Sequence, residues 1–387
     1  MKENNMKNIL YVGVDSNRYG SGLAMYEVCS QLKKRGYKVY VILPRNGNLV
    51  EILKEYCEKI IIIPYEQWMY NPDILFHRCR LKQAIGFVLN PIAEKRIYNI
   101  IKKYKIDLVH INSSATSIGV LSAQRCSVPV VWHIREYIEE GLKFCFYNRD
   151  LFIEMLKKAE KVIAISTGLY SKYLQSLGKE KICLVYDGIK LDIFEKAYLE
   201  RVKKQETIIS VIGRITEEKN QLELIQAIQV LNRNNVIVRI VGDEIGEYTN
   251  EIKRYIIAHN MTNVIFTGYS ENVVEEYKKA DIVVVPSIQE GFGRITVEAT
   301  VSGCVVIGAN SGGTQELLQL IDGEIYQLYN INDLAEKIEK VMDNLQYYIQ
   351  KNAVQREKYI SFFSAERNCD NIIKVYNECL NNEKTNL

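Results

Sequence analysis

Short apolar runs alternate with longer amphipathic stretches along the whole chain, which predicts strands alternating with helices in parallel sheets covered on both faces. A first series of predicted buried strands covers residues 9–14, 39–43, 59–63, 108–111, 130–132 and 162–165, and a second series covers residues 208–212, 236–241, 264–266, 282–285 and 305–307. The first helix is expected over residues 23–35, because Gly36 is a good left-handed terminator. The pattern predicts an α/β protein with two Rossmann-like units.

Chain length supports two domains, because 387 residues exceed what one hydrophobic core usually serves. We expect an N-terminal domain over residues 1–186 and a C-terminal domain over residues 206–364, joined by the polar segment 187–205 as a linker. The final segment, 365–387, is expected to contain an amphipathic helix over residues 365–380.

Composition excludes several classes of protein. Hydrophobic residues make up 47% and charged residues 25% of the chain, as in ordinary globular domains. No apolar stretch approaches the roughly 20 residues that span a bilayer, and the first five residues resemble no export signal, so a cytoplasmic protein is expected. Nine cysteines without a CxxC pair and four scattered histidines suggest neither a disulfide framework nor a metal site.

The small net charge of +3 hides an asymmetry between the halves of the chain. Residues 1–186 carry 28 Lys and Arg against 17 Asp and Glu, whereas residues 187–387 carry 22 against 30. A basic first half suggests an anionic partner or surface. Membrane phosphates fit better than nucleic acid, because no nucleic-acid-binding motif is visible.

Chemistry is expected in the loops that follow strands, where doubly wound sheets bind ligands. The first such loop follows a strand ending at Gly213 and precedes a helix beginning near Asn220, and it carries Arg214 and Lys219. A guanidinium and an ammonium suit a diphosphate that gains charge as it leaves. The alternative is that both are solvated charges paired with Glu217 or Glu218.

The second loop, residues 286–293, again joins a buried strand to a helix and carries Glu290, with Glu298 eight positions later. A helix beginning near Gly293 would offer its N–H groups to a phosphate, and carboxylates accept the paired hydroxyls of sugars and ribose. Otherwise Glu290 is a charge favoured by the helix dipole and Glu298 a solvated glutamate. The apolar neighbours of Glu298 suggest a buried helix, where an unpaired carboxylate is costly.

Together these motifs, Gly213-Arg214-x4-Lys219, then Glu290-Gly291-Phe292-Gly293-x4-Glu298, then residues 311–316 (SGGTQE), resemble glycosyltransferase family 4, retaining enzymes of GT-B fold that include capsular polysaccharide and glycolipid enzymes. The resemblance implies two Rossmann-like domains facing across a cleft, with residues 365–380 crossing back to the first domain. Arg214 and Lys219 would hold the donor diphosphate, Glu290 the transferred sugar and Glu298 the nucleotide ribose. The predicted donor contacts also include Gly291, Phe292, Gly293, Arg294 and Ile295.

In the first half, Gly20-Ser21-Gly22 resembles the glycine-rich loop of the family, where backbone approaches the donor, and His133 resembles the histidine that reaches the reaction centre. Otherwise His133 is a structural histidine at a strand end. Two positions depart from the family pattern: Asp187 stands where Asn usually precedes glycine, and Val305 stands where Pro is common.

The mechanism implied by the resemblance is metal-independent transfer without an additional cofactor, in which the acceptor hydroxyl attacks from the face that the diphosphate leaves. The catalytic candidates are His133, Arg214, Lys219 and Glu290. The runner-up is a non-catalytic protein of the same fold that binds a nucleotide sugar or a glycan. A glycosidase is disfavoured because about 12 Å of continuous helix would separate the two glutamates. An oxidoreductase is disfavoured because the glycine loop lacks the last glycine of GxGxxG.

The acceptor is expected to be a polysaccharide precursor or a glycolipid. Segment 65–104 mixes aromatic and basic residues suited to a membrane interface, namely Trp68, Tyr70, Phe76, Phe87, Arg78, Arg80 and Lys82. Peripheral association with an anionic membrane at the inner face of the cell membrane follows as an expectation. A long helix packed on the first domain, with a solvated basic face, explains the same residues.

Overall fold

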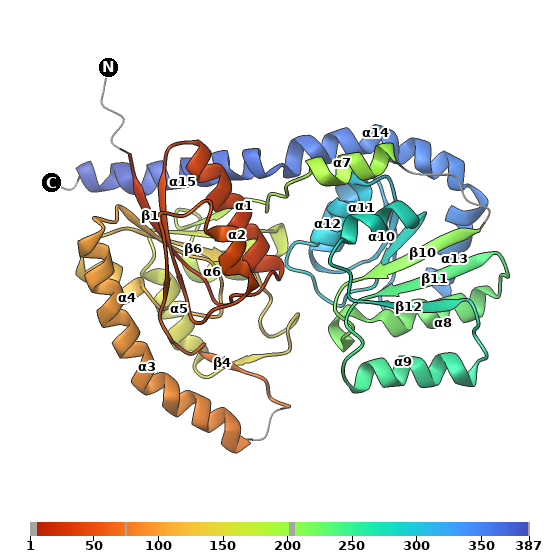
Figure 1. Cartoon of the computed structure of the whole chain (residues 1–387), viewed down its shortest axis with the longest axis horizontal. Helices are drawn as coiled ribbons and strands as arrows, with labels where there is room; N and C mark the ends of the chain where they lie inside the picture. Colours follow the sequence, from red (N-terminus) through yellow and green to blue (C-terminus); the bar gives the residue numbers. More distant parts are fainter. Residues whose placement is uncertain (1–5, 74–75, 201–205, 386–387) are drawn as a thin grey trace. The chain divides into compact units, whose positions relative to one another are not determined.

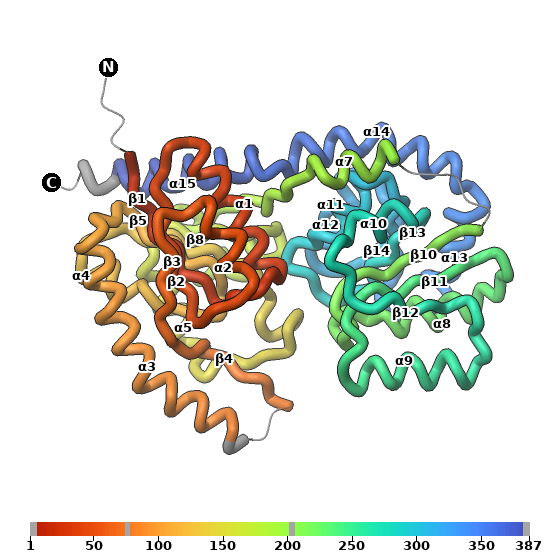
Figure 2. Tube along the Cα trace, viewed as in Figure 1, coloured from red at the N-terminus to blue at the C-terminus, as the bar shows by residue number. Residues whose placement is uncertain are grey.

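The computed structural model describes residues 6–73, 76–200 and 206–385, with side chains omitted at 76–77 and 382–385. The chain start and part of the expected linker therefore lie outside the described residues. The chain forms two compact units: unit 1 comprises residues 1–188 and 365–387, and unit 2 comprises residues 189–364. Figure 2 traces unit 1 from red to yellow and again in terminal blue, whereas unit 2 runs from green to blue.

Unit 1 is built on a seven-stranded sheet in the order β3-β2-β1-β5-β6-β8-β9, in which every pairing is parallel. Its strands are β1 (Asn8–Val12), β2 (Lys38–Leu43), β3 (Lys59–Ile62), β5 (Leu108–Ile111), β6 (Val130–Ile134), β8 (Lys161–Ala164) and β9 (Ile182–Leu184), and β4 (Met69–Tyr70) and β7 (Cys145–Phe146) form a separate antiparallel pair. The helices are α1 (Gly20–Lys34), α2 (Asn48–Leu53), α3 (Phe76–Lys103), α4 (Val120–Arg125), α5 (Arg149–Lys157), α6 (Thr167–Leu177) and α15 (Ala365–Thr385).

The last helix of the chain belongs to the core of unit 1. Cys369, Ile372 and Tyr376 of α15 pack with Met25 of α1 and Tyr11 of β1 in one buried hydrophobic cluster. Burial of apolar surface is the main favourable term in folding, at about 25 cal/mol per Å². The return of the chain to unit 1 is therefore part of how this unit is stabilised, and Figure 1 shows α15 beside β1 and α1.

Unit 2 is built on a six-stranded parallel sheet in the order β12-β11-β10-β13-β14-β15. Its strands are β10 (Thr207–Ile212), β11 (Val236–Val241), β12 (Val264–Gly268), β13 (Ile282–Val285), β14 (Val305–Ala309) and β15 (Glu324–Tyr326). Its helices are α7 (Asp192–Leu199), the 3-10 turn η1 (Glu217–Lys219), α8 (Gln221–Leu231), α9 (Glu247–Ala258), α10 (Val273–Lys279), α11 (Arg294–Val301), α12 (Gly312–Leu320), α13 (Ile331–Asp343) and α14 (Leu345–Phe363).

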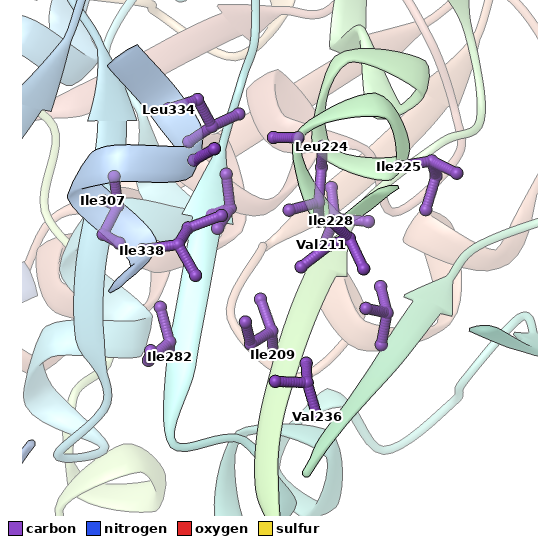
Figure 3. Close-up of a cluster of buried hydrophobic side chains, with 14 of the residues drawn as sticks. Ile209, Val211, Leu224, Ile225, Ile228, Val236, Ile282, Ile307, Leu334 and Ile338 are labelled. Carbon is purple, nitrogen blue, oxygen red and sulfur yellow. The ribbon is translucent and has the colours of Figure 1, made fainter. Parts of the chain in front are cut away.

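The core of unit 2 lies between its sheet and helices α8 and α13 (Figure 3). Ile209 and Ile307 of the sheet meet Leu224 of α8 and Ile338 of α13, and all four are fully buried. The central strand β13 is buried at every position, as expected for a parallel strand covered on both faces.

The alternation of predicted strands and helices is confirmed, and the differences lie in short elements. Strands β9 and β15 have only three residues each, too few for a recognisable apolar run. Helix α7 lies within the stretch expected to be a linker, where it packs on α10 and α11. Within residues 6–73, 76–200 and 206–385, no helix combines the length and apolar character needed to cross a membrane.

Candidate active site

In unit 2, the three loops that carry the sequence motifs meet at the carboxyl edge of the sheet. They follow β10, β13 and β14, which are neighbours in the sheet. The backbone N–H of Ile288 donates to the carbonyl oxygen of Glu218 at 2.9 Å, and the Ser311 hydroxyl donates to the Ser287 carbonyl at 2.9 Å. This edge is where open α/β sheets bind ligands.

Lys219 and Glu290 form an ion pair between the first and second of these loops. Their side chains are 24% and 17% exposed, respectively. Burial alone would raise the pKa of Glu290, but the charges of Lys219 and Arg214, with hydrogen bonds from Lys219 and Ser287, hold that pKa below its ordinary value. Glu290 is therefore an ionised acceptor beside two cations, which contradicts the alternative that pairs Lys219 only with its sequence neighbours.

Two glycines allow the third loop to approach Glu290 closely. A Cβ atom at Gly312 would lie 2.5 Å from the carbonyl oxygen of Glu290, and one at Gly313 would lie 2.1 Å from that of Phe292. With no such atom present, the N–H of Gly313 donates to the Glu290 carbonyl at 2.9 Å. The second loop then turns into α11 through Gly293, whose φ of +96° favours glycine. The backbone around Glu290 is thus fixed from two sides.

Glu298 lies on α11 and is held by two side chains of unit 2. The Tyr277 hydroxyl donates to Oε2 of Glu298 at 3.0 Å, and Arg294, one turn earlier on the helix, lies 3.4 Å from Oε1. Burial is the main reason that the pKa of Tyr277 is raised well above its ordinary value, with the Glu298 charge adding to it. A carboxylate 9% exposed with both oxygens engaged is a rigid acceptor.

The remaining predicted donor contacts of unit 2 differ in what they can offer. Phe292 is 4% exposed and packs edge-to-face on Phe363, so only its backbone is available. Ile295 lies near the first loop, because a Cβ at Gly213 would be 3.4 Å from its Cδ1. Gly291 and Gly293 form the turn itself, and Arg294 contacts Glu298.

In unit 1, His133 lies on β6 with its imidazole fully buried. Its Nδ1 is 3.1 Å from Nη2 of Arg135 and 3.3 Å from Nε2 of His110. Its Nε2 has no hydrogen-bond partner among the described residues. Burial first, then the charge of Arg135, lowers the pKa of His133 well below 6.5, so the ring is neutral near pH 7. An unsatisfied buried polar atom costs about 1–3 kcal/mol, and such an atom indicates a water or ligand site.

Arg135 connects three chain segments at the carboxyl edge of this sheet. It forms a buried ion pair with Asp187 and donates through Nε to Oδ1 of Asn112 at 3.1 Å. Asn112 in turn donates through Nδ2 to the carbonyl oxygen of Ser21 at 2.9 Å. The network therefore links the surroundings of His133 to the start of α1.

The glycine-rich loop begins α1. A Cβ at Gly22 would lie 2.5 Å from the carbonyl oxygen of Asn17, so this position has no room for a side chain. Gly20 is exposed at the first position of the helix, and Ser21 is held through Asn112. The backbone at Gly20 is therefore presented at the same sheet edge as the Arg135 network.

The structure brings Arg214, Lys219 and Glu290 together in unit 2, and it places His133 beside the glycine-rich loop network in unit 1. The sequence motifs do not include Arg135, Asn112 or Tyr277, so the sequence did not predict that these residues belong to the candidate site. Asp187 was noticed only as a departure from the family pattern, and its buried ion pair with Arg135 explains why a charged residue stands there. The signal that could have found Arg135 was its position directly after a buried strand, two residues beyond His133.

Comparison with known proteins identifies both halves of the chain. A model of glycosyl transferases group 1 matches residues 194–357, and a model of glycosyltransferase family 4 matches residues 19–193. A galactosyltransferase of Escherichia coli, named UDP-Gal:alpha-D-GlcNAc-diphosphoundecaprenol alpha-1,3-galactosyltransferase, is 26% identical over 310 residues, covering 72% of this chain and 77% of its own.

Solved structures agree with the predicted fold. A glycosyltransferase from Rickettsia africae superposes with a TM-score of 0.80 at 24% identity, covering 97% of this chain and 99% of its own. HepE of Anabaena, solved with UDP, superposes with a TM-score of 0.79 at 19% identity, covering 96% and 100%. Two parallel α/β sheets with these likenesses confirm the GT-B fold. The chain therefore belongs to the group 1, family 4 glycosyltransferases and is a glycosyltransferase.

Proposed function

We propose that this glycosyltransferase moves a sugar, with retention of its anomeric configuration, from a nucleoside diphosphate sugar to a lipid-linked glycan or polysaccharide precursor. The observation that carries the proposal is the contact between Lys219 and Glu290, with Arg214 nearby, at the carboxyl edge of the unit 2 sheet. There a cation suited to phosphate lies beside a carboxylate suited to sugar hydroxyls. A ligand that carries both groups, a phosphate next to a sugar, matches this pair.

The donor diphosphate would bind to Arg214 and Lys219. As the bond between the anomeric carbon and the diphosphate oxygen breaks, negative charge grows on that oxygen, and a preorganised cation stabilises it. The acceptor hydroxyl oxygen bonds to the anomeric carbon on the same face and passes its proton to the leaving diphosphate. No protein nucleophile is needed, and the enzyme contributes orientation and charge stabilisation.

Glu290 and Glu298 would bind opposite ends of the donor. Glu290 precedes α11 and is ionised, which suits the hydroxyls of the transferred sugar. Glu298 is held rigidly by Tyr277 and Arg294, which suits the paired hydroxyls of a ribose. UDP in the HepE structure and UDP-Gal in the name of the E. coli relative support a nucleoside diphosphate sugar as the donor.

His133 would act at the transferred sugar as a hydrogen-bond donor. Its neutral ring and unpartnered Nε2 support this role. Backbone at Gly20–Gly22 would approach the donor phosphates, because the loop has no side chain at the two glycines.

The acceptor proposal rests on the name of the E. coli relative and on a surface of unit 1. The E. coli relative is named for an acceptor with a diphosphoundecaprenol group. A nucleotide sugar and a lipid-linked acceptor would meet at the cytoplasmic face of a membrane. A protein that works there needs a surface for lipid.

Helix α3 supplies a candidate for that surface, which we call the outer face of α3: Leu81, Ile85, Val88 and Ile92. Their spacing of four, three and four residues puts them on one side of the helix, yet they are 62%, 38%, 62% and 49% exposed. The opposite side, including Ala93 and Ile97, is fully buried. In Figure 1, α3 (orange) runs as one long helix along the outside of unit 1.

Charge around the outer face of α3 favours an anionic lipid surface as its occupant. The part of the same helix that carries this face, residues 78–96, also carries the exposed cations Arg78, Arg80, Lys82, Lys95 and Arg96. The acid within this stretch, Glu94, is engaged by the N–H groups of Gly119 and Ser122. An apolar ridge between cations is typical of helices that lie in a membrane interface, where each cation adds about 1 kcal/mol. The side chain of Phe76, noted in the sequence, lies outside those that the structure describes.

Sedimentation with vesicles tests this surface. The full-length protein should bind phosphatidylcholine vesicles that contain phosphatidylglycerol, and high salt should release it. Ile85→Ser with Val88→Ser should weaken binding about tenfold or more, whereas Val230→Ser with Val354→Ser, which changes exposed apolar residues of unit 2, should not. The assignment would be overturned if the protein bound neutral vesicles equally well, or if the variant with Ile85→Ser and Val88→Ser bound anionic vesicles as well as the unchanged protein. A dimer lost only in the helix variant would assign the face to a second copy.

The catalytic proposal is tested by incubating the enzyme with a set of nucleoside diphosphate sugars and a lipid-diphosphate acceptor and measuring release of the nucleoside diphosphate. We expect acceptor-dependent release with one donor. Donor binding without release, under conditions where a lipid-linked acceptor also binds, would favour the non-catalytic alternative.

A further inference from the structure

A chain of buried hydrogen bonds runs from the last helix of unit 1 to His133. The hydroxyls of Tyr11 and Tyr376 are 2.6 Å apart, and the Tyr376 hydroxyl is 2.7 Å from Nδ1 of His110. Nε2 of His110 is then 3.3 Å from Nδ1 of His133. All four side chains are fully buried.

Arg135 determines which atom donates and which accepts at the His133 end of this series of hydrogen bonds. A guanidinium donates hydrogen bonds and accepts none, so Nδ1 of His133, 3.1 Å from Nη2 of Arg135, must be an acceptor. The proton of a neutral His133 ring is then on Nε2. Arg135 is itself fixed by Asp187 and Asn112, so it cannot turn away without breaking a buried ion pair.

The same rule orders the rest of the chain. Nδ1 of His133 has one lone pair, which Arg135 and His110 share. The 3.3 Å contact is a hydrogen bond only when Nε2 of His110 carries the proton and donates. Nδ1 of His110 then accepts from the Tyr376 hydroxyl, and that oxygen accepts from Tyr11. Each of these hydroxyls and ring nitrogens is thereby assigned as a donor or an acceptor. The Nε2–H of His133 is the donor that has no acceptor among the described residues.

We infer that Arg135, His110 and Tyr376 are positioning residues that hold His133 as its Nε2–H tautomer and keep that N–H for an oxygen of the substrate. Only the use of the N–H at the substrate rests on the proposed function. The tautomer itself follows from the hydrogen bonds.

The protonation state agrees with this arrangement. Burial, then the Arg135 charge, lowers the pKa of His110 as well as that of His133 well below 6.5. Burial likewise raises the pKa of Tyr11 and Tyr376 well above 10, so both hydroxyls keep their protons. In the Nε2–H tautomer the free side of His133 donates a hydrogen bond and offers no lone pair, so it is not a general base.

Nitrogen NMR of the full-length protein labelled with ¹⁵N-histidine tests the tautomer directly. The chain has four histidines, so His77→Gln and His259→Gln leave the signals of the buried pair. We expect both buried rings to be neutral at pH 7, each with a protonated Nε2 and an unprotonated Nδ1. A protonated Nδ1 on His133, or a charged ring, would overturn the inference.

Tyr376→Phe tests the positioning role, with Tyr359→Phe as its control. Both changes remove one buried hydroxyl, but Tyr359 bonds to the Leu317 carbonyl in unit 2. Tyr376→Phe should give His110 a mixture of tautomers and lower kcat about tenfold with KM nearly unchanged. The loss stays well below the roughly 10⁴-fold of a catalytic histidine left in the wrong tautomer, because Arg135 still donates. The control should leave the histidine signals unchanged.

Unaltered His110 and His133 signals in a folded Tyr376→Phe variant would contradict the positioning chain. Should Tyr376→Phe fail to fold, His110→Gln takes its place: a glutamine N–H can still donate to His133, so the His133 tautomer should persist, and its reversal would count against the chain. A normal transfer rate in folded His133→Asn would instead contradict the proposed use of His133 at the sugar, while the NMR result would stand independently.

Discussion

Units 1 and 2 share one architecture but present different chemistry at the carboxyl edges of their sheets. Unit 2 presents charges: Lys219 and Glu290 are ion-paired yet partly exposed. Unit 1 presents a neutral imidazole, His133, fixed by buried hydrogen bonds. Under the proposed function, unit 2 would neutralise the leaving diphosphate and unit 1 would orient the neutral sugar.

The physical requirements of the two edges explain this difference. A cation that must meet a phosphate has to stay hydrated or paired until the ligand arrives, and Glu290 is a suitable temporary partner for Lys219. A neutral donor can be buried at lower cost, provided that its other polar atoms are bonded. Unit 1 meets this condition through Arg135 and His110.

The largest effect is expected when the charges of unit 2 are removed. Lys219→Ala and Arg214→Ala should each lower kcat by about 10²-fold or more, because they remove stabilisation of charge that appears in the transition state. Steady-state kinetics with saturating donor measures this. Lys278→Ala is a matched control, since Lys278 is also an ion-paired, partly buried lysine of unit 2. Wild-type rates in folded Lys219 and Arg214 variants would show that these charges do not stabilise the leaving diphosphate.

A smaller effect is expected in the pH dependence of stability, which should differ between unit 1 and unit 2. His110 and His133 have folded pKa values well below 6.5, whereas unfolded histidine titrates near 6.5. Below that pH the unfolded chain binds more protons than the folded chain. The free energy of unfolding is therefore highest above about pH 6.5, and it decreases by up to about 1.4 kcal/mol for each ring with every pH unit below that value. For Glu290, whose folded pKa is lowered, the corresponding loss of stability begins only as pH falls below the unfolded glutamate value of about 4.3.

Tryptophan fluorescence can measure the effect in the intact protein, because both tryptophans, Trp68 and Trp132, belong to unit 1. The urea midpoint reported by fluorescence should decrease as pH is lowered from 7.5 to 6.0, where unfolded histidine takes up its proton. His259→Gln, at an exposed histidine of unit 2, should keep this dependence. A midpoint constant over that range would show that the histidines of unit 1 are not buried as neutral rings.

The smallest expected effect is that of a chelator. If Arg214 and Lys219 supply the positive charge at the diphosphate, excess EDTA should leave the transfer rate within about twofold of its value without EDTA. Complete loss that an added divalent ion restores would mean that a metal shares this role.

Sequence alone could predict that the candidate residues of unit 2 gather at one edge of the sheet, because each motif is local. Gly213 to Lys219 and Glu290 to Glu298 each lie within one loop and the adjoining helix, and the alternation of strands fixes which edge those loops share. What the pattern could not show is that Lys219 contacts Glu290, since this depends on the adjacency of β10 and β13.

Unit 1 was less predictable because its network is assembled from distant segments. Tyr376 contacts His110 across 266 positions of sequence, and a tyrosine in an amphipathic helix resembles any other core residue. Arg135 resembles a surface charge until its burial is known. The outer face of α3 was equally ambiguous, because the pattern along a helix does not reveal which side is covered.

The central claim is that Glu290 and Glu298 bind opposite ends of one donor, and calorimetric titration of full-length variants with UDP tests it most directly. UDP lacks the transferred sugar, so Glu290→Gln should leave its affinity unchanged or raise it a few-fold as Lys219 is released. Glu298→Gln should weaken it about tenfold or more, since a hydrogen bond to a charged group contributes about 1.5–3 kcal/mol. Equal losses in both variants, or a larger loss in Glu290→Gln, would contradict this account.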